Sequence, residues 1–485
     1  MKRLFQIILW LIAVLLIVIV VKTLLFRSRQ ESAGNAVKVA VSDSCVKHLA
    51  EAVSFPTVSY STDSPIDTAS FTGYNIFLKN TYPRVFEKLE KQTFNHFGLL
   101  FKWQGTDTTL KPVVLMAHYD VVPPGDSSSW ERKPFSGYFD GTYIWGRGTL
   151  DDKASMISVL EAVEDLLGEG FKPARTIYLS FGYDEEISGM RGAGTIVKFF
   201  KKNNIVPEFV LDEGMAVSVG MVPMIKKPVA LIGTSEKGYL TVKLTVEMPG
   251  GHSSTPEKET SVTLLNRAIM NLVQKQVKPA ISGPVNDFIN YIGPEMPFFA
   301  RAIFANKWLL KGLLLDIYTG TASGNAMVRT TTAPTVVSAG IKDNVIPSRA
   351  EALVNFRILP GESISGLLAH IRKVIGDDRV IISADSSTSS EPAPVSPVDT
   401  KGFTTISLSI RQVYKDVLVA PTLMLGSSDS KFFSAVTSNI YKFAPIVVTS
   451  ADMERIHGLN ERTKADDFKK GIQFYHQVII NSQGK

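Results

Sequence analysis

Two adjacent glutamates, Glu185 and Glu186, follow an apolar run, Ile177 to Phe181, that predicts a buried strand. Carboxylates at the end of a core strand repel each other and lose hydration, which favours their protonation. A divalent cation removes that penalty, and carboxylate oxygens are ligands that zinc accepts. The pair therefore indicates a metal site. A glutamate pair on a solvated helix is the alternative that these two residues alone leave open.

A histidine and an aspartate close a second strand-like run. His118 and Asp120 follow the apolar residues Val113 to Ala117. On an extended backbone residues i and i+2 point to the same side. Asp120 is therefore placed to orient the imidazole of His118, as carboxylates do behind metal-bound histidines. A structural histidine without a metal is the alternative.

Two aspartates follow a glycine-rich turn at residues 145–149. Asp151 and Asp152 stand there, directly before an expected helix, Ala154 to Leu167. Either aspartate could be a metal ligand at the start of that helix. Either could also be an ordinary helix N-cap, because a side-chain oxygen at that position accepts bonds from the free N–H groups of the first turn.

Two further segments offer candidate ligands. Asp212 and Glu213 follow the short apolar run 209–211, and His457 lies far downstream. All the candidates sit where an apolar strand or a glycine-rich turn ends. Because open α/β sheets bind ligands beyond the carboxyl ends of their strands, we expect these side chains to converge at one edge of such a sheet.

Taken in chain order, these motifs resemble the co-catalytic dizinc metallopeptidases, a family that includes aminoacylase, glutamate carboxypeptidase and carboxypeptidase S. The resemblance is strongest to the branch of carboxypeptidase S and the N-fatty-acyl-amino-acid hydrolase/synthase, and it covers roughly residues 45–480. The motifs that carry it are His-Tyr-Asp at 118–120, Gly-Arg-Gly-Thr-Leu-Asp-Asp-Lys at 146–153, Asp-Glu-Glu-Ile-Ser-Gly at 184–189, Leu-Asp-Glu-Gly at 211–214, Gly-Gly-His-Ser-Ser at 250–254 and His-Gly-Leu-Asn-Glu at 457–461.

The resemblance implies two zinc ions per subunit, for which cobalt or manganese could substitute. Asp151 would bridge the two ions. His118 and Asp212 would complete the protein ligands of one ion, and Glu186 and His457 those of the other.

Three finer expectations come with this ligand set. Glu185 would be the general base, and Asp120 the orienting partner of His118. The family also holds a cis peptide after its bridging aspartate, here Asp151. Asp212 is preferred as the third acid, but a slip of one residue would put Glu213 in its place.

A second group of expected site residues lies in a different part of the chain. His252 follows an alternating strand at 240–246, and the resemblance implies that it reaches the active site of a partner subunit and donates to an oxyanion. Asn344 and Arg357 resemble positions that grip the free carboxylate of the substrate. Arginine suits that task because its planar fork binds a carboxylate through two hydrogen bonds. An exposed turn histidine and a surface arginine are the alternatives.

The expected activity is zinc-dependent hydrolysis of an amide or peptide bond next to a free α-carboxylate, in peptides or N-acyl amino acids. A deacylase of another small amide is the alternative among enzymes. A zinc-dependent binding protein without catalysis is the alternative from another class, and the presence of Glu185 argues against it.

The N-terminus predicts a membrane anchor. Residues 4–21 contain one polar residue, Gln6, and the stretch extended to Phe26 meets the roughly 20 residues that a spanning helix needs. A cleaved signal peptide is the alternative, but its apolar core is usually shorter, about 7–15 residues. Basic residues flank both ends, so their distribution does not select an orientation. A short tail before the helix and a large domain after it favour a catalytic domain outside the cytoplasm.

Charge and cysteine content exclude other classes. The net charge is +6, but five basic residues lie before residue 30, where there are no acids, so the remainder is nearly neutral. A neutral body has no electrostatic footprint for nucleic acid. Cys45 is the single cysteine, so no disulfide can form within the chain.

The order of expected elements predicts an α/β fold in three parts. Residues 1–30 form the transmembrane anchor, and residues 31–236 with 379–485 form a zinc-hydrolase domain with a central mixed sheet. Residues 237–378 are an inserted α+β sandwich that acts as lid and dimerisation domain, so a homodimer is expected. An apolar extension at 281–330 reads as core helix, with a groove for acyl chains or bilayer as the alternative.

Overall fold

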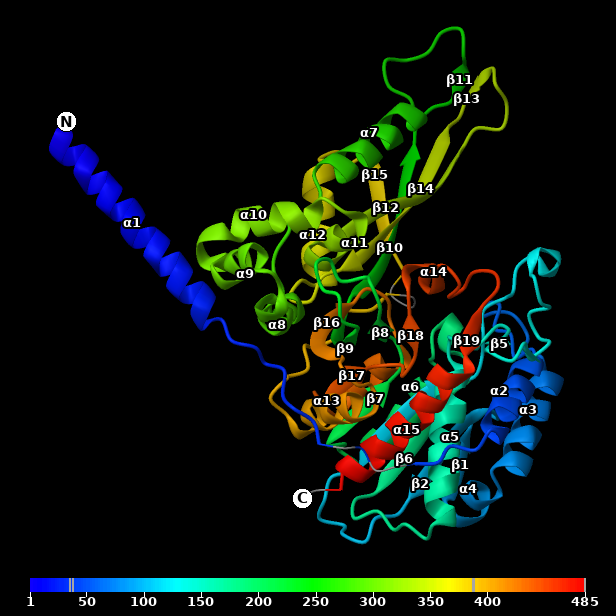
Figure 1. Ribbon diagram of the computed structural model, residues 1–485. Helices are drawn as coiled ribbons and strands as arrows, with labels where there is room; N and C mark the ends of the chain where they lie inside the picture. Colours follow the sequence, from blue (N-terminus) through cyan, green and yellow to red (C-terminus); the bar gives the residue numbers. More distant parts are fainter. Residues whose placement is uncertain (35, 37–38, 386–388, 484–485) are drawn as a thin grey trace.

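The computed structural model describes the chain except residues 35, 37–38, 386–388 and 484–485. A ten-stranded mixed sheet forms the centre of the described structure (Figure 1). In spatial order its strands are β1 (Glu90–Phe94), β2 (Gly98–Trp103), β6 (Ile177–Gly182), β3 (Val113–His118), β7 (Phe209–Asp212), β17 (Ile440–Lys442), β9 (Val229–Glu236), β8 (Val217–Ser218) and β18 (Val447–Val448), with β16 (Leu418–Met424) beside β9. The expected mixed central sheet is confirmed.

Helices cover both faces of this sheet, which explains why its central strands are continuously apolar rather than alternating. In β3, Val113, Leu115 and Ala117 join the larger core, whereas Val114 and Met116 join a second core on the opposite face. The larger core is covered by α2 (Ser44–Ser54), α3 (Thr68–Thr81), α4 (Pro83–Lys88), α5 (Lys153–Gly168), α13 (Lys401–Val413) and α15 (Ala465–Asn481); α6 (Ala193–Lys202) covers the other.

A second, antiparallel sheet has the order β12-β14-β10-β15. Its strands are β10 (Gly238–Glu247), β12 (Thr331–Ala339), β14 (Arg349–Ile358) and β15 (Val380–Ala384). Alternate residues of β10, from Leu240 to Val246, are buried against α7 (Ser261–Gln274) and α12 (Ile364–Ile375). The period-2 pattern arises because helices cover only one face of this sheet.

Four helices are inserted between α7 and β12: α8 (Gly283–Ile292), α9 (Phe298–Ala305), α10 (Lys307–Thr319) and α11 (Ala322–Val328). Tyr291, Met296 and Ala300 from this insertion belong to the larger core of the main sheet. The insertion therefore packs against the main sheet.

The N-terminal helix α1 (Lys2–Leu25) stands away from the rest of the molecule and reaches the insertion only near its C-terminal end (Figure 1). It is long and apolar enough to cross a membrane, a property that signal sequences share.

Short elements complete the description. A small sheet contains β4 (Tyr138–Phe139), β5 (Tyr143–Trp145) and β19 (Arg462–Lys464), and a two-stranded ribbon contains β11 (Gly251–His252) and β13 (Val345–Ile346). The short helices are η1 (Ser127–Ser129), η2 (Glu185–Ile187), η3 (Gly293–Glu295), η4 (Asp429–Ala435) and α14 (Ser450–Met453).

Candidate metal centre and active site

Three neighbouring parallel strands deliver the candidate side chains to one edge of the main sheet. β3 lies between β6 and β7 and is parallel to both, so the carboxyl ends of all three meet. His118 is the last residue of β3 and pairs with Gly182, the last residue of β6. Because η2 follows β6 and Glu213 follows β7, this parallel pairing brings both segments beside His118.

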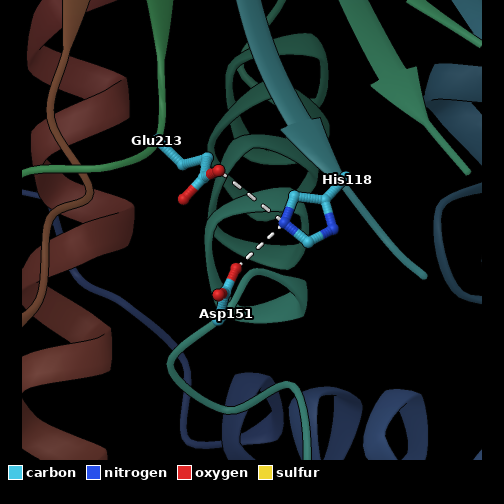
Figure 2. A group of neighbouring side chains, drawn as sticks. All are labelled: His118, Asp151 and Glu213. Atoms are coloured by element: carbon cyan, nitrogen blue, oxygen red, sulfur yellow. Dashed lines mark hydrogen bonds and ion pairs between the residues drawn. The ribbon is translucent and has the colours of Figure 1, made fainter. Parts of the chain in front are cut away.

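The first group of possible metal ligands consists of His118, Asp151 and Glu213 (Figure 2). Nε2 of His118 lies 2.9 Å from Oδ1 of Asp151 and 3.8 Å from Oε1 of Glu213. His118 is buried, and the other two are partly buried.

A second group shares one member with the first. Oδ2 of Asp151 lies 3.0 Å from Nε2 of His457, which lies 3.4 Å from Oε2 of Glu186. In both groups the ligand atoms lie within 4.8 Å of one another. Asp151 thus turns one carboxylate oxygen to each histidine.

In this geometry Glu213, rather than the expected Asp212, lies in the group with His118. Asp212 is buried, and its Oδ2 accepts a hydrogen bond of 2.8 Å from the backbone N–H of Ser430. Glu213 is the residue that reaches His118. Asp212 is the last residue of β7, and Glu213 is the first residue beyond the strand, where the chain turns it towards His118.

Asp120 connects His118 with the glutamate pair. Nδ1 of His118 lies 3.0 Å from the carbonyl oxygen of Asp120 and 3.4 Å from its carboxylate. That carboxylate also accepts hydrogen bonds from the backbone N–H groups of Glu185 and Glu186, at 3.1 and 3.2 Å. One buried aspartate therefore fixes the position of the His118 imidazole relative to the backbone of the glutamate pair.

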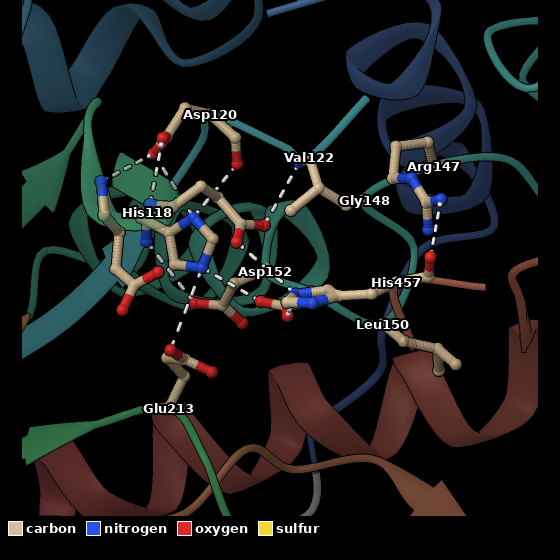
Figure 3. A network of polar contacts seen from close by, with 12 residues as sticks. His118, Asp120, Val122, Arg147, Gly148, Leu150, Asp152, Glu213 and His457 are labelled. Carbon is tan, nitrogen blue, oxygen red and sulfur yellow. Dashed lines mark hydrogen bonds and ion pairs between the residues drawn. The ribbon is translucent and has the colours of Figure 1, made fainter. Parts of the chain in front are cut away.

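A buried ion pair, not expected from the sequence, joins the loops that carry Asp151 and His457. Nη1 of Arg147 lies 2.7 Å from Oε2 of Glu461, and both side chains are buried. Oε1 of Glu461 accepts backbone bonds from Gly148 and Leu150 at 3.0 and 2.7 Å. Nη2 of Arg147 donates to the carbonyl oxygens of His457 and Gly458 at 3.3 and 2.9 Å, and Figure 3 shows Arg147 beside His457.

The signal for this pair was present in two of the motifs, Gly-Arg-Gly at 146–148 and the glutamate that ends 457–461. What the pattern lacked was any indication that the two segments, more than 300 residues apart, meet. Gly146 has a φ of 145°, and a Cβ there would lie 2.3 Å from a methyl group of Val53. Glycine is required at that position on both counts.

The peptide bond between Asp151 and Asp152 is cis, as the resemblance implies. Asp152 is the residue before α5, but its side chain makes no capping bond to that helix. Its Oδ2 instead accepts a bond of 3.4 Å from the backbone N–H of His118. Helix capping therefore does not account for either aspartate.

The electrostatics of the centre are those of crowded carboxylates. Burial raises the pKa values of Glu185, Glu186 and Glu213, and repulsion from Asp151 raises them further. Hydrogen bonds to the carboxylates of Asp151 and Glu186 raise the pKa of His457 to about 10. The centre therefore opposes the negative charge of its glutamates and favours a positive charge on His457.

This donor set fits zinc. Each group contains an imidazole nitrogen and carboxylate oxygens, which are the usual nitrogen and oxygen ligands of catalytic zinc. A cation between them would relieve the cost of burying like charges. His118 has a carboxylate and a carbonyl behind its second ring nitrogen, the arrangement that fixes the tautomer of a metal-bound histidine.

The three site residues expected from the second part of the chain, His252, Asn344 and Arg357, do not lie at this centre in the single chain. His252 lies on β11, is exposed, and its Nδ1 is 2.7 Å from Oγ of Ser254. The carbonyl of Asn344 accepts a bond from Ser253, so these two segments lie together. Figure 1 shows the β11–β13 ribbon at the end of the second sheet remote from the main sheet.

Arg357 lies at the opposite end of that sheet. It pairs with Tyr239 in the strand register, and its guanidinium carbon stands 4.7 Å from the centre of the Tyr239 ring. This end is where β10 continues from β9 of the main sheet. Arg357 and Asn344 therefore do not form one site within a subunit.

Comparisons with known proteins give a family match and several similar proteins. The model of peptidase family M20/M25/M40 matches residues 114–481. The chain is 40% identical over 441 residues to "Probable carboxypeptidase S-like 2" of Dictyostelium discoideum, covering 90% of this chain and 85% of that protein. It is 41% identical over 441 residues to "N-fatty-acyl-amino acid synthase/hydrolase PM20D1" of Xenopus tropicalis, with the same coverage of 90% and 85%.

A solved structure shares the fold. The M20 family metallo-carboxypeptidase Sso-CP2 from Sulfolobus solfataricus superposes with a TM-score of 0.66 at 20% identity, covering 90% of this chain and 99% of that one.

Proposed function

This chain belongs to peptidase family M20/M25/M40, and we propose that it is a dizinc amidohydrolase that cleaves an amide bond next to a free α-carboxylate. The observation that supports this most is Asp151, which offers one carboxylate oxygen to each of two histidine-containing groups. A carboxylate shared in this way suits two metal ions held side by side.

The proposed ligands follow the geometry. His118 and Glu213 would hold one zinc ion, Glu186 and His457 the other, and Asp151 would bridge them. Glu213 takes the place that the sequence assigned to Asp212. When bound, two zinc ions supply Lewis-acid stabilisation of the amide oxygen and lower the pKa of a water towards neutrality.

Glu185 is the proposed general base. It stands one residue before Glu186, and the bond from its backbone N–H to Asp120 fixes its position. It would take the proton of the attacking water and pass it to the nitrogen of the leaving amine. Burial raises the pKa of Glu185, and a base that is no longer strongly acidic holds the proton better during that transfer.

The substrate class rests on the names of the relatives and on the second sheet. The relatives are named as a carboxypeptidase S-like protein and an N-fatty-acyl-amino acid synthase/hydrolase, which suggests peptides and N-acyl amino acids for this chain. Asn344 and Arg357 are proposed to bind the free carboxylate. Because they lie at opposite ends of the second sheet, we assign them to the active sites of two different subunits.

A homodimer would provide that arrangement. Residues 237–378 would act as lid and dimerisation domain, with His252 donated to the partner's active site. β12 supports this proposal because it is an edge strand whose Val336 and Val337 side chains are exposed. Unpaired edges of this kind invite pairing with another chain. Residues 1–30 are proposed as an uncleaved anchor, with the catalytic domain on the non-cytoplasmic side.

Hydrolysis of a matched substrate set tests the proposal. We expect turnover of N-acyl amino acids or dipeptides, loss of turnover on chelation, and recovery with zinc. The matched control is the same substrate with its α-carboxylate converted to a carboxamide, which should be cleaved far more slowly. Equal rates for acid and carboxamide would favour a deacylase of other small amides. Zinc binding without any turnover would favour a binding protein.

A further inference from the structure

The last turns of α1 are fastened to the inserted helices by polar contacts. Nδ2 of Asn306 lies 3.2 Å from the carbonyl oxygen of Ile19 and 3.2 Å from Oγ1 of Thr23. Nη2 of Arg301 donates to the carbonyl of Phe26 at 2.6 Å, just beyond the end of α1. The bonds of Arg301 reach carbonyl groups at the end of α1, where a helix leaves them without internal partners. Together with the bonds of Asn306 they give the end of α1 a defined place on α9 and α10.

The contact is extended by an aromatic and a cationic side chain. Nζ of Lys22 stands 4.8 Å from the centre of the Trp308 ring. Tryptophan is enriched at the boundary between lipid and water, and lysines near helix ends reach towards that boundary. Lys22 and Trp308 thus form a pair typical of the interfacial layer.

The outer side of α9 and α10 carries large apolar side chains that nothing in the described structure covers. Leu309, Leu313 and Ile317 are spaced four residues apart along α10, and all three are exposed. Phe298 and Phe299 are exposed at the start of α9, with Phe299 at 84%. We call Phe298, Phe299, Trp308, Leu309, Leu313 and Ile317 the α9–α10 face.

The inner side of the same helices is packed. Leu314 of α10 is fully buried in a cluster with Val285, Ile289 and Val328, and Ala300 of α9 is buried in the larger core. The α9–α10 face is therefore the outer side of a folded unit, and its exposure does not reflect loose helices. Contiguous apolar surface of this kind marks an interaction site.

We infer that the α9–α10 face lies in the lipid bilayer next to α1, as an interfacial helix pair in the outer part of one leaflet. The inference rests on the proposed membrane insertion of α1. The 24 residues of α1 span about 36 Å at 1.5 Å per residue, more than the roughly 30 Å hydrocarbon core. Asn306, between α9 and α10, bonds to Ile19, which precedes the end of α1 by about 9 Å. If α1 ends at the membrane surface, α9 and α10 lie at about that depth, within the 5–10 Å typical of interfacial helices.

Charge and topology favour a bilayer over a second copy of the chain. Arg27 and Lys22 lie beyond or near the end of α1, where anionic head groups would lie. The exposed charges of α10, Lys311 and Asp316, cancel each other. The surface proposed for dimerisation is the exposed edge strand β12, which belongs to the second sheet and not to the inserted helices. The bilayer is the one partner that continues directly from α1.

Depth measurements on the full-length chain in phospholipid vesicles test this inference. In a Cys45→Ala background, single cysteines at Ile317 and Ile381 would each carry an environment-sensitive fluorophore. The two isoleucines are a matched pair, exposed to 53% and 52%, but Ile381 lies on β15 of the second sheet. A third cysteine at Ile12, in the middle of α1, reports insertion of that helix by itself.

We expect nitroxide-labelled lipid to quench the Ile317→Cys probe severalfold more than the Ile381→Cys probe, and a water-soluble quencher to show the reverse order. If the probe at Ile12→Cys is quenched by lipid but that at Ile317→Cys only by the water-soluble reagent, the inference is wrong while the anchor stands. Protection of Ile317→Cys from both quenchers would mean a protein partner, which also overturns it. An Ile12→Cys probe outside lipid would defeat the proposed anchor itself.

A measurement without substitutions guards against misfolded variants. Hydroxyl-radical labelling of the unmodified chain in vesicles should leave Phe299 and Trp308 largely protected, whereas Tyr60, exposed to 67%, should react. Addition of detergent to dissolve the vesicles should change the labelling of the two α9–α10 residues and leave Tyr60 unchanged. Strong labelling of Phe299 in intact vesicles would contradict the inference.

Discussion

At the scale of single residues, the candidate centre is organised by one carboxylate. Asp151 directs Oδ1 to His118 at 2.9 Å and Oδ2 to His457 at 3.0 Å. The other acids, Glu186 and Glu213, each lie near only one of these histidines. Removal of Asp151 should therefore affect both groups, whereas removal of another acid should affect one.

Asp151→Ala is expected to lose both zinc ions or to bind them with greatly reduced affinity, because each ion loses a ligand. Metal analysis after dialysis against a weak chelator measures the stoichiometry. The partly buried Glu186 and Glu213 can take up protons in place of the metal, so the fold should stay intact, which circular dichroism checks. Retention of two tightly bound zinc ions would contradict the bridging role.

A pair of adjacent substitutions separates Glu213 from Asp212. Glu213→Gln should lose one zinc ion, because its side chain faces His118 at 3.8 Å. Asp212→Asn should keep both ions and cost about 1–2 kcal/mol of stability, since the amide oxygen only partly replaces a charged acceptor of the Ser430 N–H. Zinc stoichiometry and thermal unfolding of the two variants provide the comparison. The opposite pattern would restore Asp212 as the ligand.

The sequence predicted the convergence of strand ends but not the choice between these two neighbours. Period-2 alternation assigns side chains to faces only while the backbone remains extended. β7 ends at Asp212, so Glu213 lies beyond the reach of that rule. The same limit did not affect His118, which is still inside β3 and faces the edge predicted for it.

At the scale of elements, loops far apart in the chain are locked together around the centre. Arg147 and Glu461 tie the turn before α5 to the loop that carries His457, and Asp120 ties β3 to η2. Motif spacing predicts each loop separately, but it does not show which loops come into contact, so the buried ion pair was not predicted. The packing of α8 and α9 against the main sheet was missed because it too is a contact between segments far apart in the chain.

The β11–β13 ribbon supports a prediction about catalysis between subunits. If His252 donates to the oxyanion in the partner's site, His252→Ala should leave zinc content unchanged and lower kcat by on the order of 10²–10³, the usual effect of removing one oxyanion donor. Steady-state kinetics should show a much smaller change in KM. Ser254→Ala, which removes only the hydroxyl beside the imidazole, is the matched control.

Mixing His252→Ala with Glu185→Gln extends this test to the dimer. A hybrid dimer would contain one active site with both an intact base and an intact donated histidine, so part of the activity should return. If hybrids form, as shown by mass-tagged subunits, and activity stays absent, His252 does not act across an interface.

At the scale of the whole molecule, α1 and the α9–α10 face carry the proposed contact with a membrane. The apolar N-terminal stretch was predictable from composition and length alone, because no tertiary contact is needed to recognise it. The partner of its C-terminal end was not, since Asn306 and Arg301 are nearly 300 residues away.

Deletion of residues 1–30 should yield a folded enzyme with its hydrolytic activity largely intact, because no candidate site residue lies in that stretch. It should still bind lipid vesicles weakly through the α9–α10 face, which vesicle flotation measures. The deletion also removes the bonds between Gln30 and the backbone of Val419, so a modest loss of thermal stability is expected. Failure to fold would mean that α1 and the residues after it are part of the core.

The central claim, that this chain hydrolyses amides with Glu185 as the base, is tested most directly by the turnover of zinc-loaded Glu185→Gln. This change keeps the shape of the side chain and removes its ability to accept a proton. With two zinc ions bound per chain, the rate should fall on the order of 10²–10⁴, the range supplied by general base catalysis. A zinc-loaded Glu185→Gln enzyme that turns over at the wild-type rate would contradict the account.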